Sequence, residues 1–122
     1  MLNSGFEIKC TKNVALLSGT MRLASPKLYK NYFSPIINLM SISKKNSKYI
    51  VDLTQLQYLN VAGLAALAHV VDTADHYNQH LTLIINNDKT WQHKHIQTFQ
   101  QLFNNISIQI INQHSTNKSH HD

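Results

Sequence analysis

Eight histidines are the first side chains in this sequence that could do chemistry, because imidazole binds metals and transfers protons near neutral pH. Three pairs are close in sequence: His76 and His80, His93 and His95, and His120 and His121. We expect a helix to end between His76 and His80. On a helix, His93 and His95 would point about 200° apart. His120 and His121 lie in a polar tail. A structural zinc site normally needs four well-placed ligands. The sequence therefore predicts no metal site and no cofactor.

Nucleophiles and acid–base pairs are also scarce. Cys10 lies in an expected strand and is interpreted as a small buried hydrophobic residue, and a single cysteine excludes an internal disulfide. No Gly-x-Ser-x-Gly turn is present, and three glycines leave no phosphate-binding loop. Asp72 and Asp75 are three residues apart and are expected to be solvated on an exposed helical face. We therefore predict no catalytic residues and no enzymatic activity.

The most informative stretch is VDLTQLQYLNVAGLAAL, at residues 51–67. Asp52 is expected to end an apolar strand, and Asn60 stands where a helix N-cap belongs. The backbone amides of residues 61–63 would lie at the positive end of that helix, and Gly63 would allow a partner backbone to approach and neighbours to pack tightly. An apolar knob that favours protein contact would then consist of Val61, Ala62 and Leu64. The alternative is that Asn60 is only a cap and Val61 only a core residue.

Strands and helices alternate around this stretch. The expected strands are residues 6–10, 13–18, 49–55, 81–86 and 106–111. The first two are expected to form a hairpin, with Gly19 ending its second strand. The strand at 49–55 is expected to be buried on both faces. The expected helices are 26–42, in two pieces or kinked at Pro35, then 61–77, and one holding Trp91 to Phe103 after a cap at Asn86-Asn87-Asp88. Within 61–77 the apolar stripe is Leu64, Leu67, Ala68, Val71 and Ala74. The order ββαβαβαβ predicts an α/β fold whose sheet is mostly parallel apart from the N-terminal hairpin. We expect one domain over residues 1–113 and a disordered polar tail at 114–122.

The charge pattern narrows the expected partners and location. The net charge is +5 and the sequence pI is near 9.4, but the lysines and arginine are scattered, so we expect no direct binding of nucleic acid. No apolar run approaches the ~20 residues of a membrane span, and the first residues lack a secretion signal. These features predict a cytoplasmic protein that does not insert into membranes.

The sequence resembles the STAS domain, named for sulfate transporters and anti-sigma-factor antagonists, over roughly residues 5–111. Val51-Asp52-Leu53-Thr54 and Gly63-Leu64 match its signature, whereas Asn60-Val61-Ala62 replaces Asp-Ser-Ser. The resemblance implies a sheet of four to five strands with helices mainly on one side. GTMRL at 19–23, Pro35-Ile36-Ile37 and Trp91-Gln92-His93-Lys94 are similar to a STAS-like regulator family best known from cyanobacteria, which has a Trp-Gln-x-Lys helix. His95-Ile96 departs from that family.

The resemblance implies a bacterial signal-transduction function in transcription regulation. In STAS antagonists the first signature serine is phosphorylated by a kinase that is also an anti-sigma factor, and here Val61 occupies that position, so no phosphorylation site is expected. The domain would then be locked in its binding form or adapted to a different partner. The implied partner is an ATP-binding anti-sigma kinase or a related signalling protein, and self-association into a homodimer stays open. The implied partner-binding residues are Asn60, Val61, Ala62, Gly63 and Leu64.

A second hypothesis is a subunit of a lipid-transport ABC ATPase. STAS subunits of that kind resemble GLAALAHVVDTAD followed by LTL and NDK, which occur here at residues 63–75, 81–83 and 87–89. The extra residues 19–45 and the Trp-Gln-x-Lys helix favour the regulator. An enzyme or small-ligand domain on the same scaffold ranks last, because the chemistry of a site is missing.

Overall fold

Strands and helices alternate along residues 5–111, the part of the chain that the computed structural model describes. The strands are β1 (Phe6–Thr11), β2 (Val14–Met21), β3 (Lys48–Leu59), β4 (His80–Asn86) and β5 (Ile106–Ile111). The helices are α1 (Lys30–Ile42), preceded by the 3₁₀ turn η1 (Pro26–Tyr29), α2 (Val61–His76) and α3 (Thr90–Leu102). The predicted order of elements is confirmed, and the tail at 114–122 lies outside the described residues.

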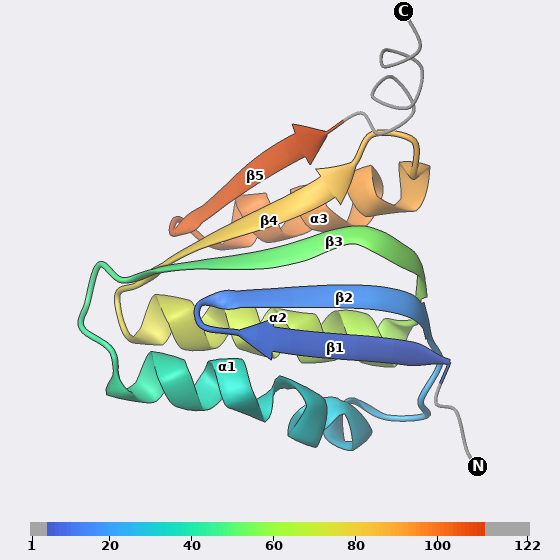
Figure 1. Ribbon diagram of the computed structural model, residues 1–122. Coiled ribbons are helices and arrows are strands. Elements are labelled where there is room, and N and C mark those ends of the chain that lie inside the picture. The colour runs from blue at the N-terminus through green and yellow to red at the C-terminus, as the bar shows by residue number, and fades with distance from the viewer. Residues whose placement is uncertain (1–4, 112–122) are drawn as a thin grey trace, which may run out of the picture.

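The strands form one sheet in the order β1-β2-β3-β4-β5. β1 and β2 pair antiparallel as a hairpin, and each later strand pairs parallel with the one before it. From β2 onward the chain therefore crosses over three times in the same direction along the sheet. Right-handed crossovers in one direction place every connecting helix on the same face, and Figure 1 shows the three helices there. The predicted α/β fold with a mostly parallel sheet is confirmed.

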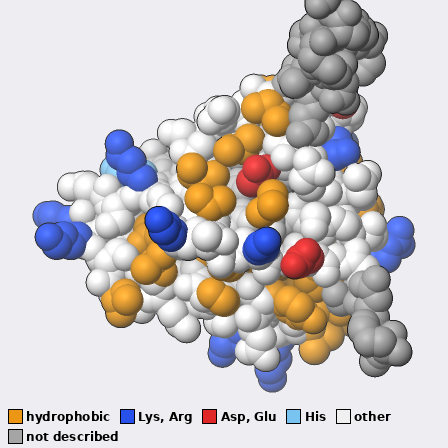
Figure 2. All heavy atoms as spheres, in the orientation of Figure 1, with side chains coloured by type: hydrophobic (Ala, Val, Ile, Leu, Met, Phe, Trp, Pro, Cys, Tyr) orange, Lys and Arg blue, Asp and Glu red, His pale blue; other side chains and the backbone are white. Residues whose placement is uncertain are grey.

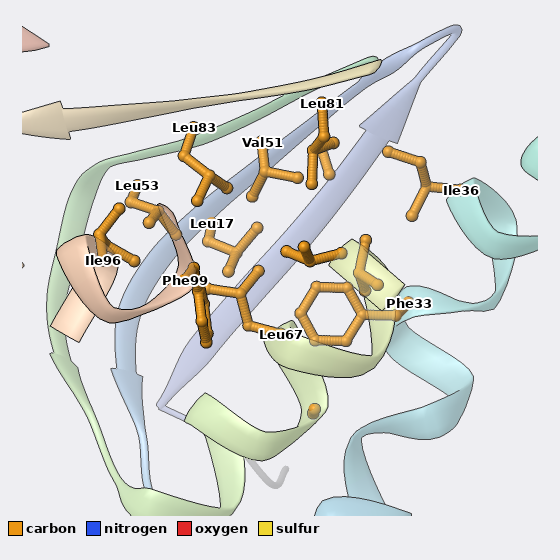
Figure 3. Packing of buried hydrophobic residues seen from close by; sticks show 14 of the residues in the cluster. Leu17, Phe33, Ile36, Val51, Leu53, Leu67, Leu81, Leu83, Ile96 and Phe99 are labelled. Carbon is orange, nitrogen blue, oxygen red and sulfur yellow. The ribbon is translucent and has the colours of Figure 1, made fainter. Parts of the chain in front are cut away.

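The core lies between this sheet and the helices. Alternate residues of the central strands point into it, such as Val51 and Leu53 on β3 and Leu81 and Leu83 on β4, and all four are fully buried. Figure 3 shows these side chains meeting others from all three helices. Burying one such side chain contributes about 1.5–3 kcal/mol, so the alternation fixes which face of the sheet the helices cover.

The opposite face of the sheet has no helix over it, and this corrects one expectation for β3. Ile50 and Asp52 alternate with the buried residues of that strand and are only half-buried. The strand is therefore not buried on both faces at Ile50 and Asp52, although Thr54 further along it is buried. Figure 2 views the molecule from this side and shows hydrophobic side chains interspersed with polar and charged ones. Asp52 also lies inside β3 and does not end it, since the strand continues to Leu59.

Gly19 does not end the second strand as expected, because β2 continues through it to Met21. Its φ of +84° lies in the region that favours glycine. A Cβ at this position would collide with the carbonyl oxygen of Gly5 and would lie 2.8 Å from Cα of Phe6. Register shifts between β2 and β3 flank the residue. Gly19 therefore lets the end of β2 pass close to the start of β1.

The first helical segment breaks before Pro35, which lies inside α1. The break falls at Tyr29, where the 3₁₀ turn becomes an α-helix, so the expected two pieces exist with their junction elsewhere. Proline cannot donate the backbone hydrogen bond to the residue four positions earlier, which is Asn31. The hydroxyl of Ser34 donates to that carbonyl instead, at 2.9 Å. The Ser-Pro pair is thereby accommodated within a continuous helix.

Two expectations about helix ends and faces are wrong. The residue at the N-cap of α3 is Lys89, which makes no side-chain capping bond, while Asn86 Oδ1 accepts from the amide of Asp88 at 2.9 Å. The Asn-rich segment is thus a turn that precedes the helix. On α2 the buried stripe is rotated from the expected one, with Leu64 and Ala68 only half-buried. Its buried residues are Gly63, Ala66, Leu67, Val70, Val71 and Ala74.

Candidate functional site

The corner between β3 and α2 consists of Asn60 and the first turn of the helix. Asn60 is extended, with φ −78° and ψ 175°, and its Oδ1 accepts from the amide of Gly63 at 2.8 Å. An asparagine with this geometry satisfies one of the amides that a helix start leaves unpaired. The predicted N-cap is confirmed.

The same side chain ties the corner to the end of β2. The Asn60 backbone N–H donates to the carbonyl of Met21 at 3.1 Å, and its side-chain amide donates to the carbonyl of Leu23 at 2.8 Å. Since β2 is the neighbouring parallel strand, these bonds join the segments that follow the carboxyl ends of β2 and β3. Asn60 is therefore a structural anchor of the corner.

Tyr29 completes this network from η1. Its fully buried hydroxyl accepts from the amide of Leu23 at 2.9 Å and donates to Asn60 Oδ1 at 3.2 Å. Burial raises the pKa of the Tyr29 phenol, and the hydrogen bond with Leu23 opposes that shift. Three segments are thus held together at the head of α2.

Gly63 is buried and lies within this packing. A Cβ at this position would lie 2.6 Å from Leu59 Cδ1 and 3.2 Å from Asn60 Oδ1. The space left by the missing side chain is used by the chain itself. Of the two expected roles of Gly63, tight internal packing is what the structure has, and its burial leaves no access for a partner backbone.

Val61 is the residue that protrudes from the corner. Its side chain is 84% exposed, whereas Ala62 and Leu64 are half-buried and pack against the core. The alternative that Val61 is a core residue is therefore wrong. The expected knob reduces to one exposed valine at the start of α2, with the half-buried Leu64 beside it.

A shallow hollow of about 140 Å³ lies next to Val61. Its lining residues come from the end of β3, the corner, and the first turns of α2 and α3: Tyr58, Leu59, Asn60, Val61, Leu64, Trp91 and His95. Trp91 is half-buried and packs against the core at the start of α3. The ring of Tyr58 is 44% exposed, and the guanidinium carbon of Arg22 lies 5.0 Å from its centroid, within cation–π range.

Gln92 holds the start of α3 beside this hollow, a role that the sequence did not reveal. Pairing between β3 and β4 stops at Asp52 and Ile84, so the later carbonyls of β3 lose their strand partner. Gln92 is fully buried there, and its Nε2 donates to the carbonyls of Leu53 at 2.8 Å and Leu56 at 3.3 Å. Its Oε1 accepts from the amide of Asn86 at 2.8 Å. Trp91 is therefore positioned by the residue that follows it.

The other candidate chemical groups do not converge on the corner. Within residues 5–111, no three or more His, Cys, Asp or Glu side chains lie close enough together to hold a metal. α2 ends at His76, which separates it from His80 as expected, and the pair at 120–121 lies outside the described residues. Cys10 is a free, half-buried thiol whose pKa is raised by burial, an effect that a backbone hydrogen bond at Ile36 opposes. Such a thiol is a poor nucleophile at neutral pH.

Within the described range, no helix is both long and apolar enough to cross a membrane.

Compared with known proteins, the chain matches no family model, and no curated protein sequence matches it significantly. The likeness to the STAS domain thus remains a hypothesis carried by the motif residues and by a fold of the expected kind.

Proposed function

We propose that this chain is a non-enzymatic regulatory domain that binds another protein through the corner at Asn60, Val61, Ala62, Gly63 and Leu64. The observation that carries the proposal is the 84% exposure of Val61 on a corner that several hydrogen bonds hold in place. An exposed hydrocarbon side chain on a preorganised surface gains free energy when a partner covers it. Asn60 and Gly63 act by shaping the corner, and Val61 and Leu64 act by contact.

The size of the hollow favours a protein partner over a small ligand. Sites for small molecules and cofactors usually enclose about 300–1,000 Å³, and this hollow is about 140 Å³. That volume suits a single apolar side chain. Tyr58 and Trp91 on its rim are of the types that carry much of the binding energy in protein interfaces.

In the proposed function, binding at this corner is not regulated by phosphorylation. A phosphorylated serine at position 61 would add about −1.5 to −2 charges to the contact, and valine has no hydroxyl to esterify. Position 61 therefore gains no phosphate charge. The proposed partner is an ATP-binding anti-sigma kinase or a related signalling protein, whose abundance or own state would set the extent of binding.

The proposal is tested by affinity capture from a lysate of the source organism, with the wild-type domain and two variants as baits. Val61→Asp places a carboxylate in the contact, and Ile42→Asp is a matched control because Ile42 is 81% exposed at the far end of α1. We expect the wild type and Ile42→Asp to retain an ATP-binding signalling protein, identified by mass spectrometry, and Val61→Asp to lose it.

Two results would contradict this proposal. Equal retention of the partner by all three baits would exclude the corner as the contact. Phosphate found on Tyr58, whose ring lines the hollow beside Val61, after incubation with the captured kinase and ATP would contradict a phosphorylation-independent surface. Capture of a lipid-transport ATPase subunit through Val61 would instead support the second hypothesis.

A further inference from the structure

A groove runs between α1 and α2 on the side of α2 that faces away from the corner. The two helices lie side by side and point in the same direction, because both connect neighbouring parallel strands (Figure 1). Two adjoining hollows of about 470 Å³ and 450 Å³ lie along them and share Ile37 and His69. We call this combined surface the α1–α2 groove.

The part of the α1–α2 groove near the starts of the helices has an apolar floor made partly of small residues, whereas the other part is lined mainly by polar residues of α2. Phe33 and Ile37 from α1 face Ala65 and Ala66 from α2 across it. Small side chains at a helix surface allow another backbone to approach closely, and apolar ones gain free energy when covered. This part of the groove is therefore suited to an apolar partner surface, and Ile37 continues it into the second hollow.

The two ends of the groove carry opposite charges. Lys27 and Lys30 border the end near the starts of both helices, and Asp72 and Asp75 border the end near the C-terminus of α2. All four side chains are exposed. The dipoles of two helices that point the same way add positive potential at the lysine end and negative potential at the aspartate end. The groove thus has a defined electrostatic direction.

The length of the groove decides the kind of occupant. The lining residues of α2 run from Ala65 to His76, which corresponds to about 17 Å or three helical turns at 1.5 Å per residue. A compact metabolite would cover only part of that length. An amphipathic helix laid into an apolar groove is a recurring mode of peptide recognition and covers a length of this order.

We propose that the α1–α2 groove docks an amphipathic helix of a partner protein, with acidic residues at one end of that helix and basic residues at the other. The acidic end lies on Lys27 and Lys30, and the basic end lies on Asp72 and Asp75. The apolar face of the helix covers Ile37 and Ala65. This surface is separate from the corner, because α2 presents Leu64 to the hollow beside α3 and Ala65 to the groove beside α1.

The test uses two synthetic helical peptides of about 14 residues, each stapled on its polar face and carrying leucines spaced i, i+3, i+4 and i+7. One peptide has glutamates at one end and lysines at the other. The second has the same composition, but its glutamates and lysines alternate, so that neither end carries a net charge. Binding to the isotopically labelled protein is followed by NMR shifts of the backbone amides of Ala65 and His69.

We expect the peptide with charged ends to bind about fivefold more tightly than the alternating one, from two exposed ion-pair clusters of ordinary strength. Lys27→Glu combined with Lys30→Glu should abolish this preference. Lys9→Glu combined with Lys12→Glu makes the same charge change on the β1–β2 hairpin and should preserve it.

Three outcomes would overturn the proposal: no shifts at Ala65 and His69 with either peptide, equal affinity for both peptides, or a preference that survives the charge reversal at Lys27 and Lys30. None of these outcomes depends on Val61, so the α1–α2 groove and the proposed function can fail independently.

Discussion

Single residues determine the shape of the corner, and some of them lie far from it in sequence. Asn60 was predictable as an N-cap, because the signal is local: an asparagine directly before an apolar helical repeat. Tyr29 was not predictable, because it reaches Asn60 across 31 positions and only the folded chain brings the two together. The exposure of Val61 was also undecided, because the sequence fits both a contact residue and a core residue at that position.

Tyr29→Phe tests the network at this scale. The change removes the hydroxyl and leaves the amide of Leu23, a half-buried residue, without this acceptor. We expect the free energy of unfolding in urea to fall by about 1–2 kcal/mol at neutral pH. A change below about 0.5 kcal/mol would show that the hydroxyl does not hold the corner.

The difference between wild type and Tyr29→Phe should also depend on pH. Because the pKa of Tyr29 is raised in the folded state, the unfolded chain releases its phenol proton first, at about pH 10. The contribution of the hydroxyl is therefore fully present below that pH and is lost as pH rises through the folded pKa. Urea unfolding of both proteins from about pH 8 to 11 should show the difference shrinking, whereas a constant difference would contradict the assigned shift.

Whole elements were easier to predict than their ends and faces. The alternation of apolar residues placed the strands and helices of residues 5–111 in the right order, because one buried face leaves a period of two or of 3.6 in the sequence. Gly19 and Pro35 were misinterpreted because their usual effect is to end an element. In this fold Gly19 is required because Gly5 lies too close for a side chain at that position. The hydroxyl of Ser34 replaces the backbone hydrogen bond that Pro35 cannot donate.

Two buried glutamines hold element ends in place, and polar residues of this type give no sequence signal for such a role. The two N–H groups of Gln79 Nε2 are shared among three carbonyls at the end of α1, those of Met40, Ser43 and Lys44. Gln92 bridges the separated ends of β3 and β4. The sequence analysis predicted this role for neither residue, because glutamine is mostly exposed in proteins.

Gln92→Leu tests this role for the start of α3. The leucine removes the buried hydrogen bonds that Gln92 makes to the carbonyl of Leu53 and from the amide of Asn86, so we expect a loss of about 2–4 kcal/mol in the free energy of unfolding. Trp91 is the only tryptophan in the chain, and its emission should move to longer wavelength as the adjoining hollow loosens. Gln97→Leu on the exposed side of α3 is the control and should stay within about 0.5 kcal/mol of wild type. Equal stability of the two variants would contradict the bridging role.

At the scale of the whole molecule, one sheet places two separate surfaces on α2. The corner at its start meets the hollow beside α3, and the α1–α2 groove follows its other side. Both surfaces arise because consecutive right-handed crossovers set α1, α2 and α3 next to one another on a single face. The sequence predicted the first surface through its motif. It could not predict the second, because the lining residues are dispersed over η1, α1 and α2 and converge only in the folded chain.

The most direct test of the central claim is the affinity of the purified partner for the wild-type domain, Val61→Asp and Ile42→Asp, measured by titration calorimetry. If the uncharged corner is the docking surface, a carboxylate at position 61 is buried unpaired on binding. We predict a loss of about 2–4 kcal/mol, or about thirtyfold or more in Kd, for Val61→Asp, and wild-type affinity for Ile42→Asp. An unchanged Kd for Val61→Asp, in a variant that unfolds at the same urea concentration as wild type, would contradict the account.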